Sequence, residues 1–272
     1  MHYQMVIRKL FFVFLCIGTA ARAHVVVWDI HGVLVKHNQK KVLSGYSFGE
    51  KLRGFFSAAG CAISHPHMRE FYFQTLSDLP YKSTTSYEVY SDDGKTPMPA
   101  LLKDFMLGNI SYEGAKKVWY SVEHKDFLNK VFEFNFDPQR FAKALELRKQ
   151  TVKLLQECAS QVDEQSNKKN VCILLSNCGP EFVQPFKERF KEEIADYVDF
   201  EHSVFSGCVH CAKPDKTIFD VLAKKIEQLP DNIKGKIFFF DDQQVNCDAG
   251  QACNPNMICA HPYDAPDILK NH

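Results

Sequence analysis

Residues 25–32 read VVVWDIHG, and this stretch decides the fold that we expect. Its first four residues are β-branched or aromatic without polar alternation, which is typical of a strand buried on both faces of a parallel sheet. The apolar run ends at Asp29, which is followed closely by His31 and Gly32. An aspartate after a strand is as often a simple turn former as a functional group. Whether Asp29 is a functional residue therefore depends on the residues at the other predicted strand ends.

The same pattern recurs twice along the chain. Residues 171–177 read VCILLSN and residues 236–242 read KIFFFDD, so each apolar run ends in polar side chains. Two further strands are expected at 197–205 and 257–260. Apolar residues with helical spacing lie between the strands, at 180–197 and 214–228. This alternation predicts the α/β class, with a doubly wound parallel sheet whose strand ends converge on a ligand site.

Residues 36–136 interrupt this alternation, because they are rich in Phe, Tyr and Leu at helical spacing and indicate four or five helices. A segment of this length is too long to be a structureless loop. We therefore expect a helical subdomain at 36–136 that covers the strand ends. It is inserted into a core formed by residues 24–35 and 137–272.

Local signals mark several boundaries near this insertion. Ser111 precedes an expected helix, and Asp137 followed by Pro138 supplies an N-cap and a first-turn proline. From there the apolar spacing predicts one long helix that reaches about Val162 and returns to the sheet. The charged run 163–170 is expected to be a surface loop.

The first 23 residues have the layout of a secretory signal peptide. Arg8 and Lys9 precede the apolar run 10–17, and a small-residue cleavage site ends at Ala23. The apolar run is shorter than the roughly 20 residues that span a bilayer, so a retained membrane anchor is the weaker interpretation. We expect an exported protein, periplasmic or secreted, with no stable membrane insertion after cleavage.

Charge and cysteine content limit the classes of partner and the cellular compartment that we expect. The 272 residues include 33 basic and 33 acidic side chains, so no positive field favours nucleic acid and no nucleic-acid partner is expected. Ten cysteines suit an oxidising compartment, although an odd number remains once Cys16 leaves with the signal peptide. Cys208 and Cys211 favour a disulfide, local or to another loop. Free thiols and a zinc site with ligands from elsewhere remain alternatives.

The carboxylates at the predicted strand ends suit metal-assisted phosphoryl transfer. Asp29 can attack phosphorus, and its other oxygen can bind Mg²⁺, a hard cation that prefers oxygen ligands. Asp242 can supply a second carboxylate oxygen to the metal. Asp241 can hold a metal-bound water or orient its neighbour. These three residues are the candidate metal ligands.

Other residues at the strand ends can bind the phosphoryl group. Lys213 is a compact positive charge that can bridge the nucleophile and the phosphate. Ser176 can donate its hydroxyl to a phosphoryl oxygen. Backbone N–H groups near Ile30 and Asn177 can add donors aimed at the developing charge. The predicted substrate is therefore a small phosphorylated molecule.

Four segments in order carry a family resemblance, at residues 25–34, 173–177, 206–215 and 238–249. With them, the chain resembles the haloacid dehalogenase-like (HAD) hydrolases over the whole sequence after the leader, apart from the inserted segment. The resemblance implies a Rossmann-like core with a helical cap inserted between the first and second motifs. It also implies Mg²⁺-dependent phosphatase or related chemistry, with Asp29 as nucleophile. We expect a phosphatase of a small phosphorylated metabolite, because a cap over the strand ends excludes bulky ligands.

His31 departs from the pattern of this family, whose phosphatases carry a second aspartate at that position as general acid and base. Histidine can transfer protons near neutral pH and could take over that role. The family also implies that the backbone carbonyl of His31 contacts the metal. The alternative is a catalytically degenerate HAD-fold protein that binds a phosphorylated ligand or a protein partner. Dehalogenation is disfavoured, because dehalogenases of this fold need no metal and would not need Asp241 and Asp242 in tandem.

Overall fold

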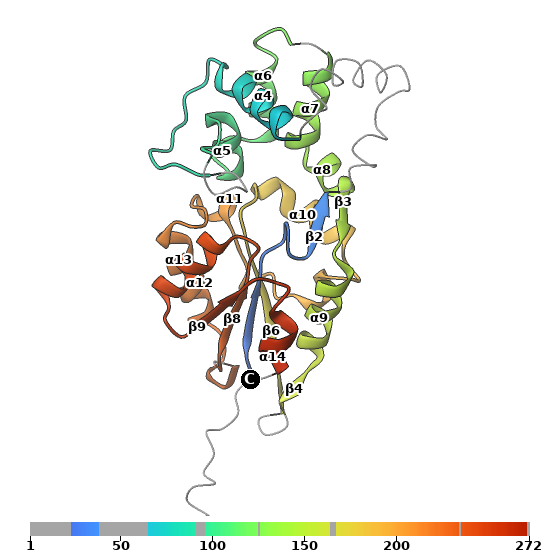
Figure 1. The fold of residues 1–272 in the computed structure, drawn as a ribbon, viewed down its shortest axis with the longest axis vertical. Coiled ribbons are helices and arrows are strands. Elements are labelled where there is room, and N and C mark those ends of the chain that lie inside the picture. Colours follow the sequence, from blue (N-terminus) through green and yellow to red (C-terminus); the bar gives the residue numbers. More distant parts are fainter. Residues whose placement is uncertain are drawn as a thin grey trace, which may run out of the picture.

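A computed structural model of the chain describes residues 23–37, 65–90, 96–124, 126–163, 167–233 and 235–270. Its centre is a parallel five-stranded sheet in the order β7-β6-β1-β8-β9 (Figure 1). In chain order, the strands are β1 (Val25–Trp28), β6 (Val171–Ser176), β7 (Val204–Phe205), β8 (Ile237–Phe240) and β9 (Met257–Ala260). The expected α/β class with a parallel sheet is confirmed. Because β1 lies between β6 and β8, the strand order reverses beside β1, where open α/β sheets bind their ligands.

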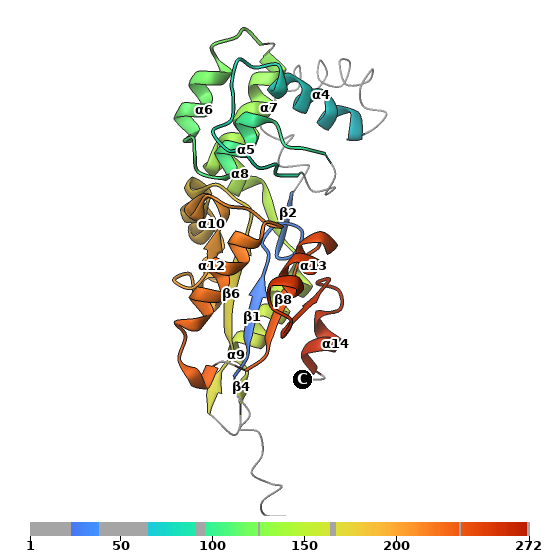
Figure 2. The same ribbon diagram turned by 90° about the vertical axis from the view of Figure 1, so that its left-hand side faces the viewer.

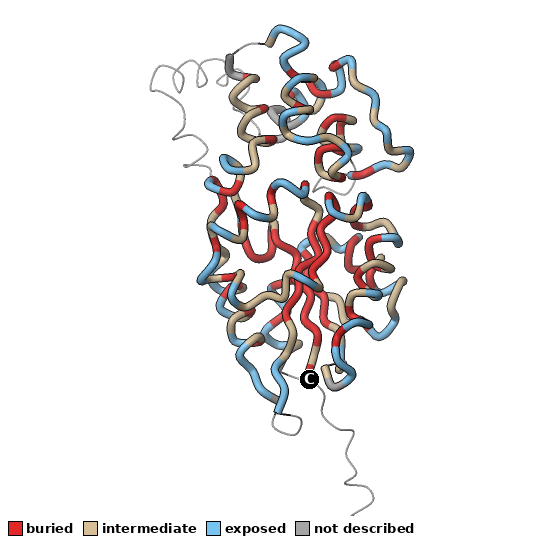
Figure 3. Tube along the Cα trace, turned by 180° about the vertical axis from the view of Figure 1, so that it is seen from behind, coloured by how far each residue is buried: buried red, intermediate tan, exposed pale blue. Residues whose placement is uncertain are grey.

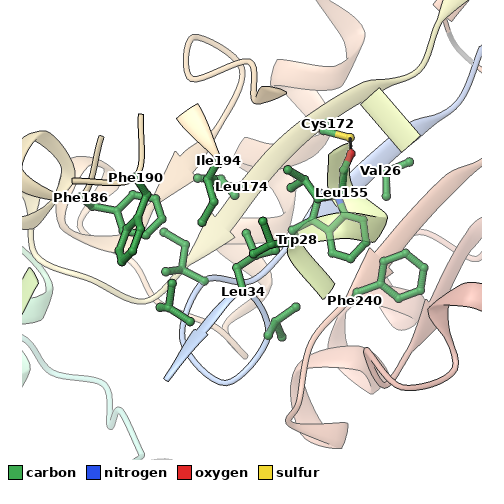
Figure 4. Close-up of a cluster of buried hydrophobic side chains, with 14 of the residues drawn as sticks. Val26, Trp28, Leu34, Leu155, Cys172, Leu174, Phe186, Phe190, Ile194 and Phe240 are labelled. Carbon is green, nitrogen blue, oxygen red and sulfur yellow. Dashed lines mark hydrogen bonds between the residues drawn. The ribbon is translucent and has the colours of Figure 1, made fainter. Parts of the chain in front are cut away.

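Both faces of β1 are covered, as its unbroken apolar sequence predicts. Val25 and Val27 face one apolar cluster, whereas Val26 and Trp28 face the other, and all four side chains are fully buried. Val25 aligns with Val171 of β6 and with Ile237 of β8, so three apolar strands lie in register. Figure 4 shows the cluster around Trp28, and Figure 3 shows how burial concentrates on these strands.

Helices cover the two faces of the sheet. The face with Trp28 packs against α9 (Lys149–Ser160), α10 (Pro180–Arg189) and α14 (Ala265–Lys270). The opposite face packs against α12 (Lys216–Glu227) and α13 (Gln244–Cys253) (Figures 1 and 2). Apolar stripes on the helices and the buried strands thus form a three-layer core.

The predicted long helix after Asp137 is wrong, although its start is right. Asp137 accepts hydrogen bonds from the backbone N–H groups of Gln139 and Arg140 and caps α8 (Pro138–Ala144). The chain then becomes extended in β3 (Leu145–Leu147), which pairs antiparallel with β2 (Val35–His37). This pairing supplies backbone hydrogen bonds that a continuous helix would have made internally. The helical spacing resumes only in α9.

Two other local expectations also need correction. The expected loop at 163–170 contains a short antiparallel pair, β4 (Val162–Asp163) with β5 (Lys168–Lys169). The strand expected at 197–205 is reduced to β7. There the hydroxyl of Ser203 accepts the backbone N–H of Leu174 at 2.9 Å, so a side chain takes the place of a strand partner just before β7 begins.

The helix expected at 180–197 ends at Arg189, as α10. Short helical turns complete the core, namely η1 (Ala195–Tyr197), α11 (Ser206–Val209) and η2 (Asp231–Ile233).

Within the described ranges, four helices lie beyond the carboxyl ends of the strands, and we call them the helical group (Figures 1 and 2). They are α4 (His65–Ser77), α5 (Ala100–Met106), α6 (Tyr112–Trp119) and α7 (Asp126–Phe136). Ser111 caps α6 by accepting the N–H of Gly114, as expected. The group has its own apolar cluster, which includes Leu76, Leu101, Phe105, Trp119, Phe132 and Phe136.

Polar contacts hold α5 and the turn after it against the core. The buried hydroxyl of Ser206 donates to the carbonyl of Met106 at 2.9 Å, and Nδ1 of His210 lies 2.8 Å from the carbonyl of Leu107. The N–H of Tyr112 also donates to Glu181 at 2.9 Å. The start of α6 is therefore tied to α10, next to the strand ends.

The boundaries of an inserted subdomain at 36–136 stay a prediction, and residues 38–64 of it lie outside the described ranges. The expected leader also lies outside them, except for Ala23. Among the helices of the described ranges, none is both long enough and apolar enough to cross a membrane.

Candidate active site

The strand ends bring the predicted site residues together. Asp29 follows β1, Ser176 ends β6, and Asp241 and Asp242 follow β8. A cavity of about 220 Å³ lies where the strand ends face the helical group. It is lined by these predicted residues: Asp29, Ile30, His31, Ser176, Asn177, Lys213 and Asp242. Asp241 does not line the cavity and is almost fully buried behind it.

Lys213 links two of the carboxylates through a buried ammonium group. Its Nζ lies 2.8 Å from Oδ1 of Asp29 and 2.6 Å from Oδ2 of Asp241, and it also donates to the carbonyl of Leu175 at 2.9 Å. Burial by itself would lower the pKa of Lys213. The carboxylates of Asp241 and Asp29 outweigh burial and raise that pKa above its usual value, so the ammonium stays charged.

Asp241 is held by donors on several sides. The side-chain amide of Asn246 lies 3.0 and 3.1 Å from its two oxygens, and the N–H of Gln243 donates to Oδ1 at 2.8 Å. Together with Lys213, these donors fix the orientation of the carboxylate. Of the two roles predicted for Asp241, this geometry suits the orienting one better. Asn246 had no predicted role, and its contact depends on the first turn of α13.

Asp29, Asp241 and Asp242 form a group of carboxylates that could hold a metal ion. One oxygen from each lies within 4.8 Å of the others. Burial raises the pKa of Asp29 to about 6, with Asp241 adding to the shift and Lys213 opposing it. Burial followed by repulsion from Asp29 and Asp241 raises the pKa of Asp242 to about 6. A divalent cation would relieve this repulsion, and the all-oxygen donor set fits a hard cation such as Mg²⁺.

Gly32 allows Asp242 to approach the other carboxylates. Its φ of +84° lies in the left-handed region that favours glycine. A Cβ atom on this residue would also collide with the carboxylate of Asp242. The turn after β1 therefore requires glycine for its conformation and for the space that Asp242 occupies.

The Asn177 side chain positions Lys213. Its amide nitrogen donates to the carbonyl of Lys213 at 2.9 Å, and its oxygen accepts the N–H of Lys213 at 2.8 Å. This reciprocal pair fixes the backbone from which the lysine reaches Asp29. Only the backbone near Asn177 was predicted to act, so this side-chain role was missed. Ser176 lies in the cavity wall and is almost fully buried.

His31 also lines the cavity, and it lies against a second histidine that sequence reasoning missed. The rings of His31 and His37 have centroids 4.5 Å apart, and both contribute to the cavity wall. Burial, with a smaller effect from His31, lowers the pKa of His37 to about 4. His37 reaches the cavity because β2 pairs with the distant β3. No local sequence signal indicates that pairing.

The favoured disulfide of Cys208 and Cys211 is not formed in the structure, in which both are free thiols. Cys208 is exposed and Cys211 is buried, and between them His210 adopts a left-handed conformation with φ of 56°. The two thiols therefore lie in different environments. The zinc alternative gains no support either, because the candidate metal cluster among the described residues is made of aspartates alone.

Comparisons with known proteins bear on the fold. No family model and no curated protein matches the chain. Among solved structures, the chain is similar to a HAD family enzyme from Bacteroides thetaiotaomicron, with 16% identity and a TM-score of 0.50 over 88% of this chain and 93% of that one.

Two further structural matches have TM-scores below 0.5. A variant of the same Bacteroides enzyme, in complex with magnesium and inorganic phosphate, matches with 15% identity and a TM-score of 0.47 over 88% of this chain and 93% of that one. A hydrolase from Pseudomonas syringae matches with 14% identity and a TM-score of 0.41 over 92% of this chain and 98% of that one. At these levels of identity the likeness concerns the fold. The resemblance drawn from the sequence is thus confirmed as a shared architecture, and this chain has the fold of a HAD family enzyme.

Proposed function

We propose that the protein is a HAD-like hydrolase, a Mg²⁺-dependent phosphatase that acts on a small phosphorylated metabolite through an aspartyl-phosphate on Asp29. One observation carries the proposal. Three aspartates from the ends of two strands meet a buried lysine from a loop, and Asp29, Asp242 and Lys213 of this group line one cavity. This combination of nucleophile, oxygen ligands and fixed positive charge suits attack on a phosphate ester.

The chemistry of the first step follows from the positions of these groups. A carboxylate oxygen of Asp29 attacks phosphorus and the bond from phosphorus to the leaving oxygen breaks, while that oxygen takes a proton from His31. Lys213 holds Asp29 in place and limits the repulsion between the carboxylate and the phosphate. In this mechanism, Ser176 and the backbone N–H groups near Ile30 and Asn177 would donate to the phosphoryl oxygens.

The second step releases phosphate and restores the enzyme. Water attacks phosphorus of the aspartyl-phosphate and gives a proton to His31. The bond between phosphorus and the Asp29 oxygen breaks, so Asp29 is again a carboxylate. Asp29 and Asp242 would hold Mg²⁺, together with the backbone carbonyl of His31 that the resemblance implies, and Asp241 would have the orienting role. When bound, the ion supplies positive charge to the phosphoryl oxygens.

Hydrolysis of acetyl phosphate and p-nitrophenyl phosphate by the purified protein, with Mg²⁺ and with EDTA, tests this proposal. We expect Mg²⁺-dependent turnover that Asp29→Asn abolishes. Asp220→Asn is the matched control, because Asp220 is an exposed carboxylate on α12 paired with Lys216. Turnover that survives Asp29→Asn would contradict the mechanism.

His31 separates this function from the alternative of a degenerate protein that only binds a phosphorylated ligand or a protein partner. We expect His31→Ala to slow the hydrolysis of alkyl phosphates much more than that of p-nitrophenyl phosphate, because p-nitrophenolate leaves without a proton. Binding of inorganic phosphate without turnover of either ester class would favour the degenerate alternative.

Export is a further part of the proposal, and it is supported by the leader-like sequence of residues 1–23. N-terminal sequencing of protein recovered from the periplasm or the medium tests it. The expected sequence begins at His24, whereas recovery of uncleaved protein from the cell interior would contradict export.

A further inference from the structure

A row of rings forms one wall of the cavity. The centroids of His31 and His37 lie 4.5 Å apart, those of His37 and Phe141 lie 4.9 Å apart, and those of Phe141 and Phe182 lie 5.2 Å apart. The last two pairs meet edge to face, which is a favourable arrangement for aromatic rings. All four residues line the cavity, so the row begins beside the nucleophile and continues away from it along the wall.

The helical group adds a second apolar wall. It consists of Leu102, Phe105 and Met106 of α5 and Phe136 of α7, together with Met98 just before α5, and all five line the cavity. The rings of Phe105 and Phe136 have centroids 4.9 Å apart. The hydrogen bond from Ser206 to the carbonyl of Met106 holds α5 against the core. The apolar wall is therefore tied to the same framework that carries the carboxylates.

Charge is distributed unevenly in the cavity. Among the lining residues that the structure describes, Lys213 is the one lysine or arginine, and its ammonium is already paired with Asp29 and Asp241. A second anionic group that lies against these walls, away from His31, would be desolvated without gaining a cation, which is unfavourable.

The geometry points to the chemical class of the substrate: we propose that it is a phosphomonoester of an aromatic or apolar alcohol that carries no second anionic group. This inference rests on the proposed function and specifies its leaving group. The cavity volume of about 220 Å³ favours a single ring. Cavities that enclose larger, drug-sized ligands have roughly 300–1,000 Å³.

Binding of phosphonates tests the inference separately from turnover, because a phosphonate is not hydrolysed. Dissociation constants are measured in the presence of Mg²⁺ for methylphosphonate, benzylphosphonate and phosphonoacetate. We expect benzylphosphonate to bind at least about tenfold more tightly than methylphosphonate, since burial of an aromatic ring contributes that much or more. Phosphonoacetate is expected to bind no more tightly than methylphosphonate.

The outcomes distinguish the two proposals. Equal binding of benzylphosphonate and methylphosphonate, or preferred binding of phosphonoacetate, overturns the inference and leaves the proposed function standing. Failure of all three phosphonates to bind counts against both. Tighter binding of benzylphosphonate than of methylphosphonate, without hydrolysis of any phosphate ester, supports the assigned ligand class and contradicts the proposed phosphatase activity.

Substitutions in the second apolar wall test whether the preference for a ring comes from this wall. Leu102→Ala is expected to weaken benzylphosphonate binding several-fold and to leave methylphosphonate binding unchanged. Leu154→Ala is the matched control, because Leu154 is a half-buried leucine on α9 that does not line the cavity. Met98→Ala, in a different segment, repeats the test if Leu102→Ala fails to fold. An equal loss for both ligands in the folded variant would overturn the assignment of this wall.

Discussion

Nζ of Lys213 lies 2.8 Å from Oδ1 of Asp29, and the two side chains are only 2% and 9% exposed. The same nitrogen contacts Asp241, whose side chain has no exposed surface. A buried charge is costly unless it is paired, and breaking a buried pair by removing one partner leaves the other uncompensated. The site therefore depends on Lys213 for stability as well as for chemistry.

We predict that Lys213→Met lowers the free energy of unfolding by about 3–5 kcal/mol, because two buried carboxylates lose their counter-charge. Denaturant unfolding at pH 7.5 measures the change. Lys216→Met is the matched control, since Lys216 forms a 2.6 Å pair with Asp220 on the surface and should leave stability nearly unchanged. Similar losses in the two variants would contradict a special role for the buried pair.

Asp242→Asn should stabilise the metal-free protein at neutral pH. The folded pKa of Asp242 is raised to about 6, above its value of about 3.9 in an unfolded chain, so its ionisation opposes folding. The variant should melt higher than the native chain above pH 6, and the difference should shrink as the pH falls and vanish below about pH 4. Thermal melting across this pH range in EDTA checks the prediction.

With Mg²⁺ present, the native chain should melt at a higher temperature than Asp242→Asn. The ion should raise the melting temperature of the native chain at pH 7.5 and do so much less at pH 5, because protonated carboxylates bind it poorly. Asp242→Asn should lose most of this response. Asp248→Asn, at an exposed position on the nearby helix α13, should keep it. A Mg²⁺ response that is unaltered in Asp242→Asn would argue against this carboxylate as a ligand.

His37→Phe should make the fold less sensitive to acid. The folded pKa of His37 is lowered to about 4, so between about pH 6.5 and pH 4 the unfolded chain binds a proton that the folded chain does not. This uptake costs the native protein about 1.4 kcal/mol of stability per pH unit in that window. Phenylalanine keeps a ring beside Phe141 and removes the titration. The difference between the two proteins should grow as the pH falls, and parallel curves would contradict the prediction.

Asp104→Asn should destabilise the helical group. The buried carboxylate accepts hydrogen bonds from Tyr81 at 2.9 Å, Ser83 at 2.7 Å and the N–H of Thr84 at 2.9 Å. Burial by itself would raise the pKa of Asp104, but these hydrogen bonds outweigh burial and lower the pKa. Its contribution to stability is thus present above about pH 3.9 and lost as the pH falls through the lower, folded value.

An amide at this position cannot accept all of these bonds, and we expect a loss of about 2–3 kcal/mol at pH 7, measured by denaturant unfolding. Asp78→Asn is the control, because Asp78 accepts a bond from Gln74 on the exposed surface of the same group. An equally small effect of both substitutions would show that the buried network contributes little.

The parts of the fold that were predictable are those whose signals are local. Four consecutive apolar residues indicate β1, and the polar residues directly after a strand indicate the site, because parallel strands bring their ends to one edge. Caps at Ser111 and Asp137 are equally local. Each of these signals depends on a few neighbouring residues, and the structure bears them out.

The parts that escaped prediction depend on contacts between distant segments. The break in the helix after Ala144 follows from the pairing of Leu147 with Val35, which no periodicity indicates. The position of His37 follows from the same pairing. The apolar wall around Leu102 depends on how α5 docks on the core, and that docking uses backbone carbonyls that a sequence does not mark.

The pairing of β2 with β3 has a mechanical consequence. The chain leaves the core along β2 and returns along β3, so the two crossings are joined side by side as a short ribbon (Figure 1). His37 on one crossing and Leu145 on the other are paired directly, and both line the cavity. Any bend in this ribbon must carry both side chains with it. A change in the angle of this ribbon would therefore move two residues of the cavity wall together.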